Sequence, residues 1–139
     1  MNYVRLTAAH MSGIARLHRL YKAEIGEAEP SQRDLDGLME AIAKGRICFY
    51  GAEWEDGLVG MCSVCTVYST FNYAPAGLFE DFYVLPEYRH RGIARKLANF
   101  AYKESGVSAM LVGCADCDVE MYVALGFDTL LGNMLARNH

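Results

Sequence analysis

Residues 79–102 read FEDFYVLPEYRHRGIARKLANFAY, and the predicted fold is built outward from this segment. Its first part, Phe79–Leu85, is rich in the aromatic and β-branched residues that fill pleated surfaces, which predicts a strand. Pro86 ends that strand because proline has no N–H group to donate to a ladder. A helix then begins at Ile93, where apolar residues recur every three or four positions, and Gly106 marks its end.

The turn between this strand and helix carries Arg89, Arg91 and Arg95 around a single glycine, Gly92. A glycine-containing turn at the start of a helix aims several backbone N–H groups and the positive end of the helix dipole at one point. Such a point is suited to hold phosphate. An ordinary solvated turn is the alternative, and the position between a strong strand and a strong helix disfavours it. The sequence contains neither the P-loop pattern nor the G-x-G-x-x-G fingerprint of dinucleotide sites.

Arg89-x-x-Gly92-x-Ala94 resembles the [RQ]-x-x-G-x-[GA] signature of the GCN5-related N-acetyltransferases, and the lead-in from Val84 through Pro86 fits as well. The resemblance covers nearly the whole chain in the order of its elements. It implies acetyl-coenzyme A as cosubstrate, with the pyrophosphate on the backbone N–H groups of the turn and the pantetheine arm paired with the strand backbone. The implied cofactor-binding residues are Tyr83, Val84, Arg89, His90, Arg91, Gly92, Ile93, Ala94 and Arg95.

Transfer of an acetyl group to an amine needs a neutral amine, and a lysine-type amine has a pKa of about 10.4, so a base is useful. Glu80 and Asp81 are carboxylates in an otherwise apolar strand. On a regular strand they face opposite sides, so only one reaches the site unless a β-bulge re-aims the other. Exposure or pairing with arginine is the alternative. The resemblance favours Glu80 as the catalytic base and Asp81 as a residue that orients a cationic acceptor.

Tyr122 lies in the segment MYVALGF at 121–127, which resembles the Y-x-x-x-G-F segment of the same family. The resemblance implies that its hydroxyl lies near the coenzyme sulphur and acts as proton donor; an aromatic that only packs the helix is the alternative. Many members carry an asparagine seven residues earlier, where this chain has Ala115. In the family's usual mechanism the amine attacks the thioester directly in a ternary complex, so no cysteine is expected to be a nucleophile.

Two predicted loops are candidates for acceptor binding. The acidic loop that starts at Glu24 is either solvated or, since this region overhangs the acceptor site in the family, attracts a cationic substrate. The loop predicted over 69–77 contains Thr70 and Phe71, which either cover a pocket or pack beneath a turn. We therefore expect Glu24, Thr70 and Phe71 to bind substrate together with Asp81.

The chain as a whole predicts one domain, residues 1–139, of α/β class. The expected order is β-α-α-β-β-β-α-β-α-β, a central mixed sheet flanked by helices that is antiparallel in its first half. Thr7 and Ser31 are expected to cap the first two helices, a hairpin turn is expected at 55–57, and closing strands are expected over 127–136. This order matches the acetyltransferase fold of the family, in which a splay between middle strands would expose backbone to the thioester arm.

Composition and charge exclude several classes of protein. The chain is 53% hydrophobic and 22% charged, which is ordinary for a globular domain, and its net charge of −4 argues against nucleic-acid binding. No apolar run reaches membrane-spanning length and no signal peptide is recognised, so we expect a cytoplasmic protein without a membrane partner. The pairs Cys62/Cys65 and Cys114/Cys117 have C-x-x-C spacing, but they are too far apart for the usual zinc site, so we expect reduced thiols and no metal.

These observations predict an N-acetyltransferase that transfers the acetyl group of acetyl-coenzyme A to the primary amine of a small molecule. The sequence of the strand at 80–84 is similar to that of polyamine and other small-amine acetyltransferases. Two alternatives stay open: acetylation of a peptide or protein amine, and a non-catalytic acyl-coenzyme A-binding module. Homodimers are common in the family.

Overall fold

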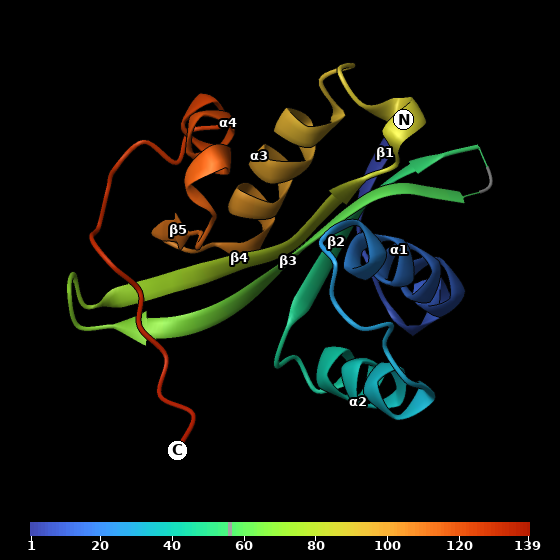
Figure 1. The fold of residues 1–139 in the computed structure, drawn as a ribbon, viewed down its shortest axis with the longest axis horizontal. Coiled ribbons are helices and arrows are strands. Elements are labelled where there is room, and N and C mark those ends of the chain that lie inside the picture. Colours follow the sequence, from blue (N-terminus) through green and yellow to red (C-terminus); the bar gives the residue numbers. More distant parts are fainter. Residues whose placement is uncertain (56) are drawn as a thin grey trace.

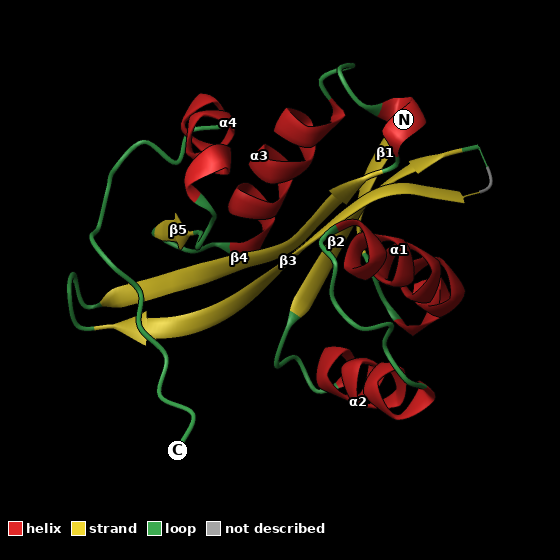
Figure 2. Cartoon of the chain, in the orientation of Figure 1, coloured by secondary structure: helices red, strands yellow, loops and turns green. Residues whose placement is uncertain are grey.

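The computed structural model covers the whole chain and describes residues 1–55 and 57–139. A five-stranded sheet runs in the order β1-β2-β3-β4-β5, with α1 and α2 on one side and α3 and α4 on the other (Figures 1 and 2). The strands are β1 Asn2–Arg5, β2 Cys48–Trp54, β3 Gly57–Ser69, β4 Ala74–Val84 and β5 Ala109–Leu111. The helices are α1 Met11–Glu24, α2 Gln32–Ala43, α3 Ile93–Ser105 and α4 Val119–Ala124.

Strand β4 is the centre of the site because it has two different neighbours. Strands β1 to β4 pair antiparallel, whereas β4 and β5 pair parallel through only three residue pairs, from Ala76–Ala109 to Leu78–Leu111. Beyond Leu78 the two strands part. In the described part of the chain, the edge of β4 from Phe79 to Val84 that faces away from β3 therefore pairs with no strand, as the predicted splay requires.

A β-bulge interrupts the pairing of β3 with β4. Ser63 pairs with Glu80 and Met61 pairs with Tyr83, so two residues of β4 oppose a single residue of β3. Asp81 occupies the bulge with φ of 54°, a left-handed conformation that aspartate tolerates better than most residues. The extra residue changes which way the following side chains point.

The sheet separates two apolar clusters. The cluster on the α1 side includes Leu17, Phe49 and Met61, all fully buried. The cluster on the α3 side includes Phe79 and Leu97, and α4 packs against it through Tyr122. The apolar surface buried on each face of the sheet holds the helices in place. The strands β4 and β5 therefore diverge between two layers of helix.

The predicted cap at Ser31 is confirmed, whereas Thr7 caps the element before the predicted one. The hydroxyl of Thr7 accepts from the N–H of Ala9 at the short 3-10 turn Ala8–His10, and α1 follows this turn without a side-chain cap of its own. The hydroxyl of Ser31 accepts from the N–H of Asp34 at 3.1 Å, and the Asp34 carboxylate accepts from the N–H of Ser31 at 2.8 Å. This reciprocal capping box satisfies two backbone donors that a helix start leaves unpaired.

Two local expectations differ from the structure, and a third falls partly outside the described residues. The loop predicted over 69–77 shrinks to a turn, because β4 already begins at Ala74 and pairs with Ser69 of β3. The closing strands predicted over 127–136 are absent from this part of the described chain, where Gly132, with φ of 96°, interrupts the apolar alternation that a strand needs. The hairpin between β2 and β3 is present, and Asp56 in its predicted turn lies outside the described residues.

Within the described residues, no helix combines the length and the apolar character that crossing a membrane requires.

Replacing Ser31 by Ala should lower the free energy of unfolding by about 1 kcal/mol, because the N–H of Asp34 loses its acceptor. Urea denaturation measures the change. Ser12→Ala is the matched control, because Ser12 is exposed on α1 and alanine favours a helix, so this variant should be as stable as the parent. An equal loss of stability in both variants would contradict a capping role for Ser31.

Candidate functional site

The turn between β4 and α3 presents backbone donors and positive charge together. His90 and Gly92 adopt positive φ angles of 62° and 82°, which turn the chain sharply into α3. No side chain caps the N-terminus of α3, and its first turn holds no acidic residue. Arg91, Gly92 and Arg95 are exposed. The N–H groups at the start of this 13-residue helix are therefore left for an anion, and two arginines stand beside them.

Arg89 has a different place from the other arginines of the turn. Its Nε donates to the carbonyl of Val84 at 2.7 Å, and its guanidinium pairs with the Glu24 carboxylate at 2.8 Å. It also lies over the ring of Tyr83, 5.3 Å from the centroid. Arg89 thus fastens the end of β4 to the end of α1. The Glu24 carboxylate, which we expected to attract substrate, is engaged in this ion pair.

The bulge places both strand carboxylates on one face of the sheet. Glu80 pairs across the strands with Ser63, so their side chains share a face, and Ser63 Oγ donates to Asp81 Oδ2 at 2.6 Å. Glu80 is exposed, whereas the Asp81 side chain retains only 18% of its accessible surface. A regular strand would have placed the two carboxylates on opposite faces. Because of the bulge, which the sequence analysis named as the alternative, both lie on the α1 side of the sheet.

His18 of α1 belongs to this group, and the sequence analysis missed it. Its Nδ1 lies 3.9 Å from Asp81 Oδ1 and is fully buried without a hydrogen-bond partner. Burial lowers the pKa of the imidazole, while the Asp81 charge acts in the opposite direction. The position of His18 in the sequence could have indicated its burial. It follows Leu17 and precedes Tyr21 by three residues, which places it beside the apolar face of α1.

Tyr122 approaches the gap between β4 and β5 from the other layer. Its ring packs 6.2 Å from Phe82 of β4 and 5.7 Å from Phe127, measured between ring centroids. Burial raises the pKa of Tyr122 to about 12, and Tyr21 of α1 contributes to that rise. Tyr122 therefore keeps its proton at neutral pH and is able to donate it.

The structure does not bring Thr70 and Phe71 to this group. Both lie in the turn between β3 and β4, and the Phe71 side chain is 92% exposed. Glu80 is six residues along β4 from Ala74, which corresponds to about 20 Å of strand. Ala115, which stands where the family commonly has asparagine, is exposed and precedes the 3-10 turn Asp116–Asp118.

Cys62 and Cys65 lack the activated thiol that a nucleophile needs. Cys62 is fully buried, and burial raises the pKa of its thiol far above the ordinary value. Burial also raises the pKa of Cys65, so the thiolate is disfavoured at both positions. Over residues 1–55 and 57–139, no group of three or more His, Cys, Asp or Glu side chains is arranged to hold a metal ion.

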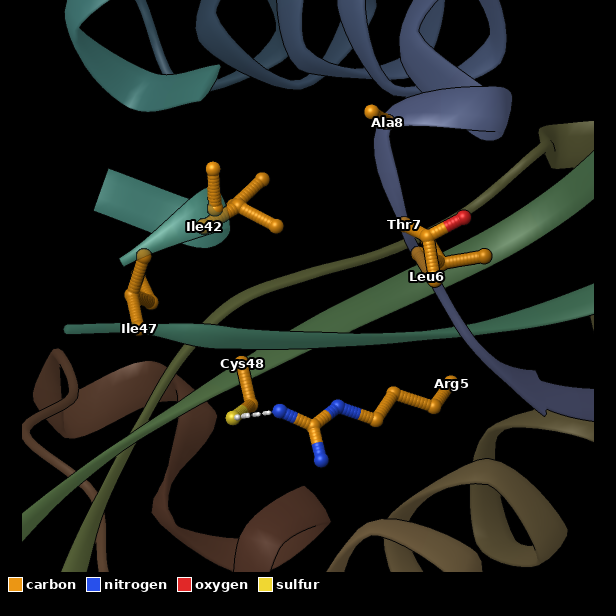
Figure 3. A pocket seen from close by; sticks show the side chains of 8 residues that line it. Arg5, Leu6, Thr7, Ala8, Ile42, Ile47 and Cys48 are labelled. Carbon is orange, nitrogen blue, oxygen red and sulfur yellow. Dashed lines mark hydrogen bonds between the residues drawn. The ribbon is translucent and has the colours of Figure 1, made fainter. Parts of the chain in front are cut away.

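Two pockets border the α1 and α2 layer. The larger, of about 530 Å³, is open to solvent and is lined by His18, Lys22, Glu27, Ala28, Pro30 and Asp34. The smaller, of about 270 Å³, lies between the end of β1, the end of α2 and the start of β2 (Figure 3). Arg5 there donates to Cys48 Sγ at 3.3 Å, and the remaining lining is mostly apolar, so this pocket lacks the acid and base groups of the first.

Comparison with known proteins identifies the fold. The sequence model of a family described as an acetyltransferase (GNAT) domain matches residues 45–129, more than half of the chain. No curated protein matches the sequence.

Solved structures are similar over nearly the full length. AAC(6')-Iy in complex with the bisubstrate analogue CoA-S-monomethyl-acetylneamine has a TM-score of 0.83 at 17% identity, with 99% of this chain and 97% of that chain covered. A predicted acetyltransferase with acetyl-CoA from Clostridium acetobutylicum has a TM-score of 0.78 at 14% identity, covering 98% and 95%. The aminoglycoside acetyltransferase meta-AAC0020, from an uncultured soil metagenomic sample and in complex with sisomicin, has a TM-score of 0.76 at 19% identity, covering 99% and 93%.

Alkylation should distinguish the thiols by their burial. Iodoacetamide at pH 8 should modify the exposed Cys114 and Cys117 well before Cys62, because alkylation requires an accessible thiolate. Mass spectrometry of tryptic peptides over a time course measures the order. The same reaction in denaturant, where all thiols are accessible, is the control. Early modification of Cys62 in the folded protein would contradict the buried, protonated thiol described above.

Proposed function

This chain belongs to the GNAT family of acetyltransferases, and from that premise we propose that it acetylates the primary amine of a small molecule by direct attack in a ternary complex. It is an acetyl-coenzyme A-dependent N-acetyltransferase. The observation that carries the proposal is the unpaired edge of β4, which begins beside Glu80 and Asp81 and ends at the uncapped N-terminus of α3. An extended cosubstrate lying along that edge would have its phosphates at α3 and its reactive end near the carboxylates.

The residues present suit acetyl-coenzyme A. The N–H groups from Arg91 to Arg95, at the uncapped start of α3, would hold the pyrophosphate, and the backbone of Tyr83 and Val84 would pair with the pantetheine arm and the acetyl carbonyl. When bound, acetyl-coenzyme A supplies an acetyl group activated as a thioester. The role of Arg89 is to hold this end of β4 in place through the Val84 carbonyl, which keeps strand and turn in a fixed relation.

Proton transfer is the other requirement of the reaction. Glu80 is exposed on the face shared with Asp81, where a carboxylate is able to accept a proton from an incoming ammonium group. Tyr122 is protonated at neutral pH, since burial raises its pKa to about 12, and it would supply the proton that the departing sulphur needs. Direct transfer is supported by the cysteines, since the pKa values of Cys62 and Cys65 are raised and neither thiol is activated.

A small cationic acceptor is favoured by the charges on the α1 side of the sheet. Glu80 and Asp81 share that face, and Glu27 and Asp34 line the pocket that adjoins His18. These carboxylates favour an amine that carries further positive charge. Among the structural neighbours, meta-AAC0020 is an aminoglycoside acetyltransferase bound to sisomicin, which supports a small polar amine as the substrate class. A cytoplasmic location is supported by the five free cysteines.

Ligand-dependent thermal stability tests the cosubstrate site. Acetyl-coenzyme A and coenzyme A at about 100 times the dissociation constant should each stabilise the folded protein by about 2.7 kcal/mol, and ATP at the same concentration should not. Gly92→Ala should weaken this stabilisation, since Gly92 has φ of 82° and open space around it at the predicted phosphate site.

Gly106→Ala is the matched control for that variant, because Gly106 has φ of 69° at the other end of α3 and also has open space around it. Each substitution should cost about 1 kcal/mol through backbone strain alone. Only Gly92→Ala should lose coenzyme A binding. Equal binding by both variants would show that the turn at Gly92 does not hold the cosubstrate.

Turnover tests the two proton-transfer residues. Release of coenzyme A during incubation with a panel of small amines identifies an acceptor, and Glu80→Gln and Tyr122→Phe should each reduce kcat with it by about 10²-fold or more. Coenzyme A should stabilise both variants as it does the parent. Tyr102→Phe is the matched control, because the hydroxyl of Tyr102, on α3, donates to the carbonyl of Ser108 just before β5 and has no role in the proposed reaction. Parental turnover by the double variant would refute both assignments, and turnover with no amine at all would favour a binding module.

A further inference from the structure

We propose that His18 and Asp81 form a dyad in which His18 Nε2 accepts the proton of the acceptor amine. The inference rests on the proposed function and goes beyond it, because it adds a second proton acceptor that stands on α1 rather than on β4. His18 comes from a helix that packs over the face where both strand carboxylates lie, and its side chain retains only 13% of its accessible surface. His18 thus lies next to Asp81 and also lines the open pocket.

The hydrogen bonds around Asp81 leave one oxygen for His18. Ser63 is completely buried, and its hydroxyl donates to Asp81 Oδ2 at 2.6 Å, so the carboxylate is held from the sheet side. The other oxygen, Oδ1, faces His18 Nδ1 at 3.9 Å. This distance is longer than a hydrogen bond, as is common for catalytic pairs before substrate binds. Because a buried nitrogen without a hydrogen-bond partner is energetically unfavourable, a shorter contact between His18 Nδ1 and Asp81 would stabilise the protein.

The contact with Asp81 determines which nitrogen of the ring is basic. A carboxylate opposite Nδ1 favours the tautomer with the proton on Nδ1, which leaves the lone pair on Nε2. Because Nδ1 is buried against β4 while the ring also lines the open pocket, Nε2 is the nitrogen on the pocket side. An ammonium group that enters the pocket therefore meets a neutral, oriented imidazole. This is the arrangement in which a carboxylate orients a histidine base.

The strained backbone of β4 is the second observation that points to function. Asp81 has φ of 54°, although it is not a glycine, and a regular strand would turn its side chain away from Ser63 and His18. Strain of this kind persists only where surrounding contacts maintain it, and it is concentrated at functional sites. Here the strained conformation of Asp81 brings its carboxylate to His18, whose Nδ1 has no hydrogen-bond partner.

The charges that face His18 come from each element packed around it. They are Lys22 on α1, Glu27 in the following loop and Asp81 on β4. The ring of Tyr21 packs 6.2 Å from that of His18, Asp34 of α2 lines the same pocket, and Glu80 lies on the same face of the sheet as Asp81. Burial is the largest influence and lowers the pKa of His18, so the imidazole is neutral at pH 7. Asp81 and Glu27 act in the opposite direction and stabilise the imidazolium once a proton arrives.

The proton is conserved through the step. The N–H bond of the acceptor ammonium breaks, its proton bonds to Nε2, and the nitrogen retains the electron pair with which it attacks the acetyl carbon. Asp81 stays a carboxylate throughout, while Ser63 keeps its own proton. The imidazolium then releases the proton to solvent through the open pocket, which returns His18 to its neutral form.

The pH dependence of kcat/KM between pH 5 and 9 tests the dyad, with the acceptor amine identified by coenzyme A release. Protonated His18 cannot act, so the parent should lose activity as the pH falls through the pKa of His18, below the ordinary value of about 6.5. His18→Gln should lower kcat/KM by about 10²-fold or more and remove this limb. Asp81→Asn should move the limb to lower pH, because the imidazolium loses its carboxylate. His139→Gln, at an exposed histidine, should keep the parental profile.

Glu80→Gln separates the two candidate bases, since it should lower the rate yet retain the acid limb set by His18. Loss of the limb in Glu80→Gln, or its retention in His18→Gln, would overturn the proposal. NMR titration of the His18 imidazole in the parent and in Asp81→Asn supplies a readout that does not depend on turnover. The pKa of His18 should fall in Asp81→Asn; an unchanged pKa would refute the dyad even if no amine were a substrate.

Discussion

The separation of β4 from β5 is the constraint on which the rest of the structure depends. After three parallel residue pairs the strands diverge, and a row of backbone groups on β4 is left without a strand partner in the described chain. Exposed strand edges normally attract other chains and are unfavourable for that reason. Here α3 and α4 stand over one side of the gap and α1 over the other, so the edge lies between two layers of helix. Such an edge favours an extended ligand over a second sheet.

The bulge in β4 has the complementary role of supplying polar groups to an apolar strand. Without it, Glu80 and Asp81 would alternate across the sheet, and one carboxylate would enter the cluster that contains Phe79. An unpaired charge in that cluster would be costly. With it, both carboxylates lie on the face of α1, where Ser63 binds one of them. The positive φ of Asp81 is therefore the local strain that makes the mixed polarity of β4 compatible with a packed core.

Sequence reasoning predicted the features that depend on neighbouring residues. The structure confirms the cap at Ser31, the αL glycine at the end of α3 and the turn that precedes α3, all of which follow from local backbone chemistry. The family and its cosubstrate followed from the motif at Arg89–Ala94. The missing strands over 127–136 show the limit of this approach, because Gly132, with φ of 96°, interrupts the alternation on which the prediction relied.

Features that depend on residues far apart in the chain could not be predicted from the sequence. His18 and Asp81 are 63 positions apart, and nothing in either segment indicates that a bulge turns one towards the other. The ion pair of Arg89 with Glu24 is similar, since both residues were predicted to face ligands and instead join β4 to α1. In each case the deciding information is the tertiary position of a charged group, which hydrophobic periodicity does not contain.

Burial has opposite effects on the pKa values of the two titratable side chains that flank the gap. It raises the pKa of Tyr122 to about 12 and lowers the pKa of His18, because in both cases it disfavours the charged form. At neutral pH the phenol therefore carries its proton and the imidazole carries a free lone pair. Burial thus favours the neutral form of both side chains, on α4 and on α1. The proposed mechanism needs these two forms, the first as proton donor and the second as proton acceptor.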